Sequence, residues 1–586
     1  MPRLLACVAV LVGLGAFAET AAAQTAQLFP GVTYDRVVEF TAHGPVAISV
    51  VRGPRPVGLY RLRTVLSNES VLGRETVSSM ERRLAGQATM VGVNGDYSRF
   101  ADGVPSGMLM RDGVLVTPPQ SERSSVGITL DGLLDVRRVG FRGTWRGTGA
   151  VRTLQLLNKQ PARDQIALFT SDWGRATPRF AGSFSVVLAP FPASVPDVDL
   201  VAPVVATAQG AALPLAPGTA VLVARGRAAQ SLRSEATVGT ELTLRVGLST
   251  DWGIVADAIG GGPVLVRDGR PVANAGEAFT SSQIVPRQPR TAIGQTANGR
   301  LLMVVVDGRQ PGYSTGMTSF ELALTLLRLG AVRAMQLDGG GSSTVAFDGT
   351  VLNSPSDGNE RPISTALMLQ YYGVYASPPL EPVLSPNGDG VADAQRLRYK
   401  LVRLATATAT LRAPDGVIAW EDSGLREAGT YDVAFPPPAR PVAEGESAME
   451  PAAVAEGRWT LTVTTTDDQG LTSTTVRRFV VNTTIGSLRV TPRLVVARRS
   501  GGRVVIRWAQ TRRARVRVTL ERRGGTVARA LGAALLPAGQ QTMIWDGRAR
   551  ARKPVPAGRY LVRVTALNGL GSISLTQAIT VRRGTG

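Results

Sequence analysis

Two aspartates follow apolar runs that are typical of buried strands. Asp307 comes directly after Leu301–Val306, and Asp338 comes directly after Ala331–Leu337. If these strands are parallel neighbours, both carboxylates leave the sheet at one edge, roughly 5–10 Å apart. That range covers the carboxyl separations used in glycoside hydrolysis. We therefore expect Asp307 and Asp338 to be a catalytic pair, with one as acid and the other as nucleophile or base.

A helix is predicted between these two strands. Thr318 and Glu321 have the spacing of a capping box, and Gly330 ends the pattern. The apolar face is predicted to consist of Phe320, Ala323, Leu324 and Leu327. The result is a strand–helix–strand unit. The fold class predicted for the first domain is therefore α+β with a mixed sheet.

The segment after Asp338 is rich in glycine and hydroxyl groups. Three consecutive glycines offer bare N–H groups to an anion, and the serines that follow offer hydroxyl donors. Arg290 and Arg361 are expected to hold a phosphate group through paired hydrogen bonds, and Asn94 is expected to hold a sugar hydroxyl. The full predicted substrate-binding set is Asn94, Asp96, Arg290, Thr318, Gly339, Gly340, Gly341, Ser342, Ser343 and Arg361.

Each of these assignments has a structural alternative. As an alternative to catalysis, Asp307 and Asp338 are able to cap turns. As an alternative to binding a ligand, Arg361 is able to form a structural ion pair. Clustered aspartates are also able to bind a metal, although the sequence does not demand one.

The chain contains one cysteine and one histidine, which excludes several kinds of catalytic and metal site. The only cysteine is Cys7, and the only histidine is His43. A disulfide, a cysteine nucleophile and a multi-histidine zinc site are therefore not expected. A Ser-His-Asp triad would depend on His43, which we expect to be a surface or structural residue.

The chain has a formal net charge of +21, carried almost entirely by arginine. Only Lys159, Lys400 and Lys553 are lysines, and arginines occur in all segments rather than in one stripe. We therefore do not expect nucleic acid as a partner. A basic surface should instead adhere to polyanions such as an anionic glycan or a cell-wall polymer.

The chain divides into four segments by composition. An apolar run followed by small residues predicts a signal peptide, and therefore secretion to the exterior or cell wall, with at most peripheral membrane contact. Beyond about residue 377 short alternating runs predict two all-β Ig-like sandwich modules. The expected boundaries are 1–23 for the signal peptide, 30–375 for the first domain, and 380–483 and 485–583 for the β modules.

A short loop opens the first β module. Asn387, Asp389 and Asp393 place oxygen-bearing side chains at intervals that suit Ca²⁺. The alternative is an Asx turn entering a strand, because the distal glutamate of an EF-hand is missing. No other cofactor is predicted.

Several separate motifs resemble the phosphodiester glycosidase family, in one order over about residues 35–373. They are Asn94–Tyr97, Gly260–Gly269, Pro289–Gly294, Val306–Arg309, Gly316–Thr318, Asp338–Thr344 and Asn353–Arg361. Asp96 departs from the family pattern, in which a small or apolar residue is common. In the last module, Trp545–Arg548 and Pro556–Tyr560 resemble the Ig-like domain of the FlgD type, which implies a spacer or adhesion role.

The resemblance implies a hydrolase that acts on a sugar phosphodiester such as an N-acetylglucosamine-1-phosphodiester. Two alternatives remain at this level. One is a phosphodiesterase that cuts the P–O bond, and the other is a non-catalytic protein that binds a wall polymer. The natural substrate, the stereochemical outcome and the oligomeric state do not follow from the sequence.

Overall fold

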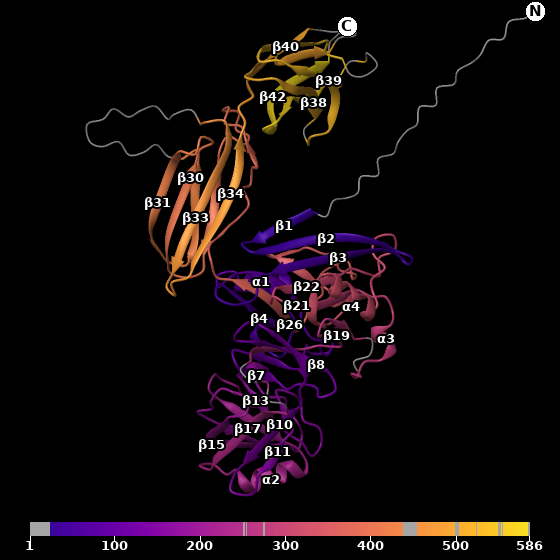
Figure 1. The fold of residues 1–586 in the computed structure, drawn as a ribbon, viewed down its shortest axis with the longest axis vertical. Helices are drawn as coiled ribbons and strands as arrows, with labels where there is room; N and C mark the ends of the chain where they lie inside the picture. The colour runs from indigo at the N-terminus through magenta and orange to yellow at the C-terminus, as the bar shows by residue number, and fades with distance from the viewer. Residues whose placement is uncertain are drawn as a thin grey trace, which may run out of the picture. The chain divides into compact units, whose positions relative to one another are not determined.

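The protein is mostly β, with few helices and several sheets (Figure 1). The computed structural model describes residues 24–583 apart from 250–251, 253–254, 273–275, 438–453, 498–502, 523, 549–552 and 554. The predicted signal peptide, residues 1–23, lies outside the described residues. The chain forms two compact units, with the main boundary after Tyr371. Among the described residues, no helix has the length and apolarity needed to cross a bilayer.

The first unit contains an eight-stranded sheet that carries the predicted strand–helix–strand unit. The helix α4 (Ser319–Arg328) lies on one face of this sheet, and its residues Leu322, Ala323 and Leu326 share a buried apolar cluster with strand residues such as Val304. The strand order is β1 (Gln24–Phe29), β2 (Val32–Thr41), β3 (Gly44–Gly53), β22 (Leu301–Val306), β21 (Arg290–Thr296), β23 (Ala331–Gln336), β19 (Val264–Arg267) and β20 (Arg270–Pro271).

The strands before the two aspartates are parallel but are not neighbours. β22 and β23 each pair antiparallel with β21, which lies between them. The predicted helix is present as α4 (Ser319–Arg328), and its capping box from Thr318 and Glu321 is formed. The expectation of adjacent parallel strands was therefore wrong, because an antiparallel strand separates β22 from β23 by two interstrand spacings, about 10 Å.

Three further sheets complete the first unit. The sheet that carries the Asn94 segment has the order β25 (Thr350–Val351), β24 (Val345–Phe347), β5 (Thr89–Asn94), β26 (Thr365–Tyr371), β4 (Tyr60–Leu66). The next has the order β7 (Val114–Thr117), β6 (Leu109–Arg111), β18 (Val255–Gly260), β8 (Ser124–Thr129), β9 (Leu134–Arg138). The last has the order β11 (Arg152–Leu154), β10 (Phe141–Arg146), β17 (Glu241–Leu248), β15 (Asp199–Gln209), β14 (Phe184–Leu188), β16 (Ala220–Ala224), β13 (Ile166–Thr170), β12 (Leu156–Leu157).

Short helices connect these strands. Within the described residues they are α1 (Val77–Leu84), α2 (Arg227–Glu235) and α3 (Ser281–Ile284) in addition to α4, with 3-10 turns η1 (Ser67–Glu69), η2 (Ser171–Trp173) and η3 (Gly340–Ser342). The finer α+β description of the first domain stays a prediction, since strands dominate it.

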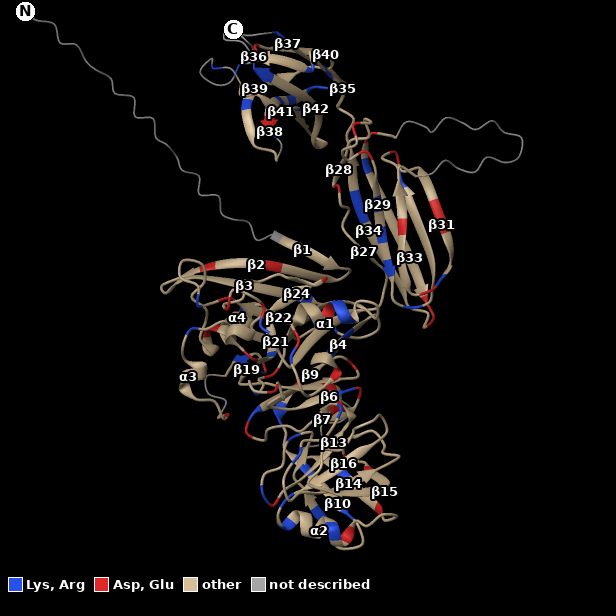
Figure 2. Cartoon of the chain, turned by 180° about the vertical axis from the view of Figure 1, so that it is seen from behind, with Lys and Arg blue, Asp and Glu red and all other residues tan. Residues whose placement is uncertain are grey.

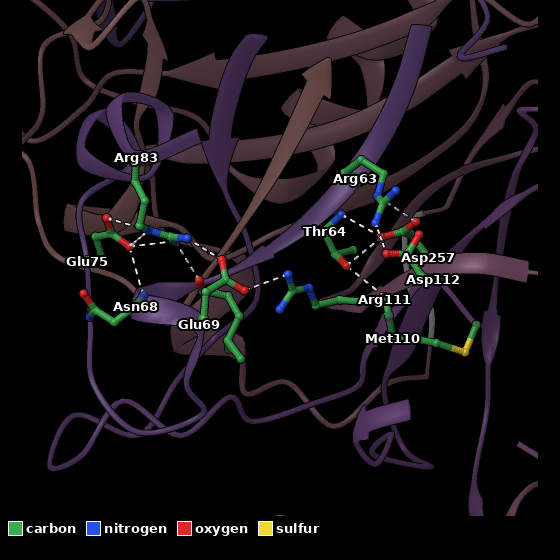
Figure 3. A network of polar contacts seen from close by, with 11 residues as sticks. Arg63, Thr64, Asn68, Glu69, Glu75, Arg83, Met110, Arg111, Asp112 and Asp257 are labelled. Carbon is green, nitrogen blue, oxygen red and sulfur yellow. Dashed lines mark hydrogen bonds and ion pairs between the residues drawn. The ribbon is translucent and has the colours of Figure 1, made fainter. Parts of the chain in front are cut away.

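A polar network joins the sheet that holds β5 to the sheet that holds β18 (Figure 3). Asp257 of β18 is buried and accepts hydrogen bonds from the backbone N–H and hydroxyl of Thr64 on β4, at 3.1 and 3.0 Å. Arg63 pairs with the same carboxylate at 3.2 Å. Arg111 on β6 pairs with Glu69 of η1 at 2.8 Å. Because buried charges are costly unless paired, these contacts fix how the two sheets meet.

The second unit holds two groups of paired sheets. The first group has the orders β27 (Tyr375–Ala376), β29 (Gln395–Leu401), β32 (Gly429–Phe435) and β28 (Val383–Leu384), β34 (Thr472–Val481), β33 (Gly457–Asp467), β30 (Ala405–Arg412), β31 (Ile418–Arg426). The second has the orders β35 (Ile485–Thr491), β37 (Val504–Gln510), β40 (Gly539–Trp545) and β36 (Leu494–Ala497), β42 (Gly571–Arg583), β41 (Gly558–Asn568), β38 (Ala514–Arg522), β39 (Val527–Leu536). The Ig-like and FlgD-type descriptions stay predictions.

The loop proposed for Ca²⁺ is organised by backbone hydrogen bonds. Asp393 accepts from the N–H groups of Asn387, Gly388 and Gly390 at 2.7–2.8 Å, and Asn387 Oδ1 accepts from the N–H of Asp389 at 3.1 Å. The described residues contain no group of three acidic, histidine or cysteine side chains placed to hold a metal. The turn alternative therefore accounts for the contacts of Asp393, and a Ca²⁺ site at Asn387, Asp389 and Asp393 stays an untested prediction.

Candidate active site

The loop that carries Asp338 is joined directly to the loop that carries Asp96. The N–H of Asp338 donates to the carbonyl of Gly95 at 3.0 Å. The side-chain amide of Asn94 donates to the carbonyl of Asp338 at 2.7 Å. This junction therefore joins the loops of two aspartates from distant parts of the chain, and the charge of Asp338 acts on Asp96.

Asn94 is the residue that makes this junction. It is completely buried, and its Oδ1 accepts from the hydroxyl of Thr291 at 2.7 Å and from the N–H of Thr344 at 3.1 Å. The predicted contact of Asn94 with a sugar is contradicted, because the side chain is enclosed and engaged within the protein. Its role in this geometry is to hold Asp338 in place.

Asp96 is a buried carboxylate at the end of β5. Its Oδ1 accepts from the N–H of Tyr97 at 2.8 Å, and its Oδ2 accepts from the N–H of Gly107 at 2.7 Å. Gly107 and Gly260 leave the room that this carboxylate needs, since a Cβ at either position would lie 2.7 or 2.6 Å from Oδ2. Arg123, Gly261 and neighbouring residues line a narrow pocket beside it.

Burial shifts the protonation of both aspartates towards neutral pH. It raises the pKa of Asp338 to about 6, against the opposing effects of hydrogen bonds from Ser342 and Gly339 and of the charges of Arg361 and Arg123. It also raises the pKa of Asp96 to about 6, and the charge of Asp338 acts in the same direction. Two interacting carboxyl groups that titrate near pH 6 are suited to hold one proton between them.

Lys159 supplies a cation on the Asp96 side of the site. Its ammonium group donates to the carbonyl of Ser106 at 2.6 Å, directly before Gly107, whose N–H binds Asp96. Burial lowers the pKa of Lys159 to about 8, while the charge of Asp96 acts in the opposite direction. Lys159 therefore fixes the loop that covers Asp96 and stabilises the ionised form of that carboxyl.

Arg361 and Arg123 supply cations on the Asp338 side. Arg361 is half-buried and pairs with Asp357 through Nε and Nη2, at 2.8 and 2.5 Å, so the predicted structural ion pair is present. Arg123 lies over the ring of Phe279 at 4.3 Å. The positive charges of both arginines lower the pKa of Asp338, and they are therefore close enough to interact with an anionic ligand there.

Asp307 lies in a different environment from Asp338. Its carboxylate accepts from the amide of Asn353 at 2.8 Å, from the N–H of Ser354 at 3.1 Å and from the hydroxyl of Tyr313 at 2.7 Å. Burial raises its pKa, and these hydrogen bonds oppose the shift. The predicted catalytic pairing of Asp307 with Asp338 stays a prediction. β21 lies between the two strands that precede these residues, and protein donors occupy both oxygens of Asp307.

Arg290 also has an internal role. The buried guanidinium donates to four backbone carbonyls at 2.7–3.3 Å, those of Gln283, Ile284, Pro286 and Met317. A guanidinium has five N–H donors, so no pair of donors is left for a phosphate. The predicted paired clamp from Arg290 is thus contradicted, and the side chain instead fixes the segment around α3.

The glycine-rich loop is only partly available to a ligand. Gly339 N–H donates to the Asp338 carboxylate at 2.9 Å, and Gly340 N–H donates to the carbonyl of Pro289 at 2.9 Å. A Cβ at Gly341 would lie 2.0 Å from Arg361, so this glycine makes room for the ion pair. The predicted use of Gly339 and Gly340 as anion-binding amides is therefore contradicted, because both N–H groups are engaged within the protein.

The residues with hydroxyl groups near Asp338 differ in whether their hydroxyls form hydrogen bonds within the protein. Ser342 hydrogen-bonds with the Asp338 carboxylate. The buried hydroxyls of Ser343 and Thr344 have no partner among the described residues. Thr318 accepts from the N–H of Glu321 at 3.1 Å, so its hydroxyl is used as a helix cap.

Sequence reasoning missed Lys159 and Arg123 and gave Asp96 too little weight. One signal was present for Lys159, because it is one of three lysines in a chain whose other basic residues are arginine. No local signal marks Arg123, which reaches the site from the loop before β8.

Comparisons with known proteins show which family part of this chain is similar to. The family model described as phosphodiester glycosidase matches residues 204–370, which include Asp338 but not Asp96. An uncharacterized SPbeta prophage-derived protein, YomE, of Bacillus subtilis is 37% identical over 107 residues, 18% of this chain and 16% of that protein. The N-acetylglucosamine-1-phosphodiester alpha-N-acetylglucosaminidase of Bos taurus is 41% identical over 68 residues, 12% of each chain.

The solved structures include a similar fold. A hypothetical protein from Synechocystis superposes with a TM-score of 0.52 at 23% identity, covering 60% of this chain and 64% of that one. The matched segments are less than a fifth of the length of the two curated relatives. Residues 204–370 of this chain are thus similar to the phosphodiester glycosidase family.

Proposed function

We propose that this protein is a secreted hydrolase that cleaves the glycosidic bond of a sugar phosphodiester, with Asp96 and Asp338 as its reacting carboxyl groups. The observation that supports the proposal is the backbone hydrogen bond from Asp338 to Gly95, which joins the loops of two carboxyl groups whose pKa values are raised. The family match over residues 204–370 supports a hydrolase of sugar phosphodiesters.

The two carboxyl groups are suited to divide the work of glycoside hydrolysis. One protonated carboxyl donates its proton to the oxygen that leaves with the phosphate, while the other, ionised, attacks C1 or activates water. The C1–O bond breaks, and water supplies the hydroxyl group at C1. Since burial holds both pKa values near 6, one proton is shared by the pair over the same pH range in which the second group is ionised.

The cations beside the pair suit a phosphate on the leaving group. Arg361 and Arg123 are positioned to interact with a charge beside Asp338. Arginine binds phosphate strongly because its planar fork matches the phosphate oxygens. We propose that these two arginines, rather than Arg290, orient the phosphodiester.

The proposed setting is the cell exterior or cell wall, with an anionic wall polymer or exopolysaccharide as natural substrate. Residues 1–23 have the sequence of a signal peptide, and export is tested by locating the protein in fractionated cells.

The decisive experiment is product analysis with an N-acetylglucosamine-1-phosphodiester. Free reducing N-acetylglucosamine is the expected product. N-acetylglucosamine-1-phosphate would instead identify a phosphodiesterase. Binding of the phosphodiester without turnover at any pH between 4 and 8, roughly two units either side of the shared pKa, would identify a binding protein.

A further inference from the structure

The charge of this chain is concentrated at its C-terminal end. Residues 485–583 contain 21 of the 65 lysine and arginine residues but only two of the 44 acidic residues, a net charge of +19. The remaining residues have a net charge of only +2. Arginine occurs in all segments, as expected, but the excess of basic over acidic residues lies in this module. Figure 2 shows blue segments on many strands of this module and little red.

Both acidic residues of this module are already paired. Glu521 pairs with Arg563 at 3.0 Å, and Asp546 pairs with Arg529 at 2.9 Å. The module therefore has no carboxylate left to neutralise its other arginines. An external polyanion is the partner that would supply the missing negative charge.

The excess of positive charge is seen directly in the three-stranded sheet of this module, β35-β37-β40. Arg489 of β35 and Arg507 of β37 are exposed and face each other across the two strands. Like charges placed directly opposite each other destabilise a sheet. An anion lying across this pair would remove that repulsion.

The five-stranded sheet carries a second basic face. Arg515 and Arg517 of β38 are exposed, and they point outward because Ala514, Val516 and Val518 between and beside them are buried in the core. Residues two apart on one strand are roughly 7 Å apart. The basic groups thus form rows on the outer faces of both sheets instead of converging on one pocket.

We propose that residues 485–583 bind a flexible, linear anionic polymer with repeated phosphate groups, such as a polyol phosphate chain of a cell wall. A flexible chain is able to contact both outer faces, whereas a stiff duplex is able to contact one face at a time. Arginine favours phosphate over other anions. This inference concerns attachment and is independent of the proposed activity.

The described part of the module lacks the features by which proteins recognise other classes of polyanion. The aromatic residues of the module are Trp508, Trp545 and Tyr560, and all three are buried. No ring is therefore exposed to stack on single-stranded bases. Every described element of the module is a strand, so the described part offers no helix for a major groove or a membrane interface.

The test measures binding of the full chain to poly(glycerol phosphate) over a range of salt concentrations. Two double variants, Arg489→Gln/Arg507→Gln and Arg515→Gln/Arg517→Gln, each remove two charges from one face. Each is expected to weaken binding severalfold and to reduce the slope of log affinity against log salt by about one for each phosphate that is no longer neutralised.

The matched control changes four exposed arginines outside the module, Arg142, Arg146, Arg267 and Arg270, to glutamine. It alters the net charge as much as both double variants together, and it should bind as the unchanged protein does. An equal weakening of binding in this control would overturn the localisation to residues 485–583.

Parallel measurements use duplex DNA, a single-stranded oligonucleotide and vesicles containing phosphatidylglycerol. Tighter binding to any of these than to poly(glycerol phosphate) at equal phosphate concentration and physiological salt would overturn the choice of partner. Sensitivity to only one of the two double variants would overturn the requirement for both faces. Circular dichroism of each variant confirms that the weaker binding does not arise from unfolding.

Discussion

Asp338 and Asp307 occupy similar places in the topology but differ in what surrounds them. Each follows a strand of the same sheet, and the two strands run in the same direction. Asp307 receives hydrogen bonds on both oxygens from an amide, a backbone N–H and a phenol. Asp338 instead contacts its own loop and lies beside Asp96 and two arginines.

The comparison shows that a carboxylate at the end of a strand is not by itself a catalytic group. Asp96 and Asp307 both accept protein hydrogen bonds on each oxygen, so these bonds alone do not separate a structural carboxylate from a reacting one. A carboxylate with a raised pKa, a carboxyl neighbour and nearby cations is available to exchange a proton with a ligand. The following variants test whether this contrast is correct.

Replacement of Asp338 by Asn is expected to cause the largest change. The variant keeps the shape of the side chain but cannot exchange a proton or carry a negative charge. The kcat should fall by on the order of a hundredfold or more. The pKa of Asp338 is raised in the folded protein, so its ionisation costs stability as pH rises towards 6. Asp338→Asn should therefore be no less stable than the unchanged protein at pH 7, as thermal unfolding would show. Near-normal turnover of the variant would mean that Asp338 takes no part in the reaction.

Replacement of Asp96 by Asn tests the pairing. A pair that shares one proton gives a bell-shaped dependence of rate on pH, with a maximum near the raised pKa values of about 6. The rate rises as the base loses its proton and falls as the acid loses its own. Asp96→Asn should lose one limb of this profile as well as most of the rate. The double variant with Asp338→Asn should lose far less than the product of the two single losses, and full additivity would contradict a shared function.

Replacement of Asp307 by Asn should separate stability from catalysis. An amide presents one acceptor and one donor, so a donor from Tyr313, Asn353 or Ser354 would face another donor. Unfolding in urea should show a loss of about 1–3 kcal/mol. The kcat of the folded variant should stay within about tenfold of the original, well short of the loss expected of an acid–base group. A loss equal to that of Asp338→Asn at unchanged stability would reverse the comparison between the two aspartates.

Replacement of Lys159 by Met should produce the smallest change. The charge of Lys159 lowers the pKa of Asp96, so its removal raises that pKa further. The limb of the pH profile that belongs to Asp96 should then move to higher pH, whether Asp96 is the acid or the base. Lys159→Arg keeps the charge and is the control. An unmoved limb in Lys159→Met would mean that Lys159 only supports the loop at Ser106.

Much of the local structure follows from neighbouring residues. The capping box at Thr318 and Glu321 and the apolar run of β22 are formed as predicted. These features depend on contacts within a few residues, which the sequence displays directly. His43 is likewise on an exposed turn, as its polar and glycine neighbours indicate. The predicted apolar face of α4 is wrong, because Phe320 and Leu324 are exposed and the helix packs through Leu322, Ala323 and Leu326.

The candidate site depends on contacts between distant segments. The sequence of the strands β22 and β23 led to the prediction that Asp307 pairs with Asp338. In the structure β21, which comes earlier in the chain, lies between these two strands. The neighbours of Asp96 are Gly107, Gly260 and Lys159, which are 11 to 164 residues away. No periodicity in the sequence shows that these residues meet.

The sequence by itself determined the residue types, the caps, the apolar strands and the concentration of charge in the last module, because these are properties of composition and short-range order. Only the tertiary structure decided which carboxylates are paired, which are saturated and which arginines are occupied. The physical reason is that hydrogen-bond saturation and the pKa of a carboxyl group depend on burial and on donors brought from other strands, and burial is a property of the folded chain.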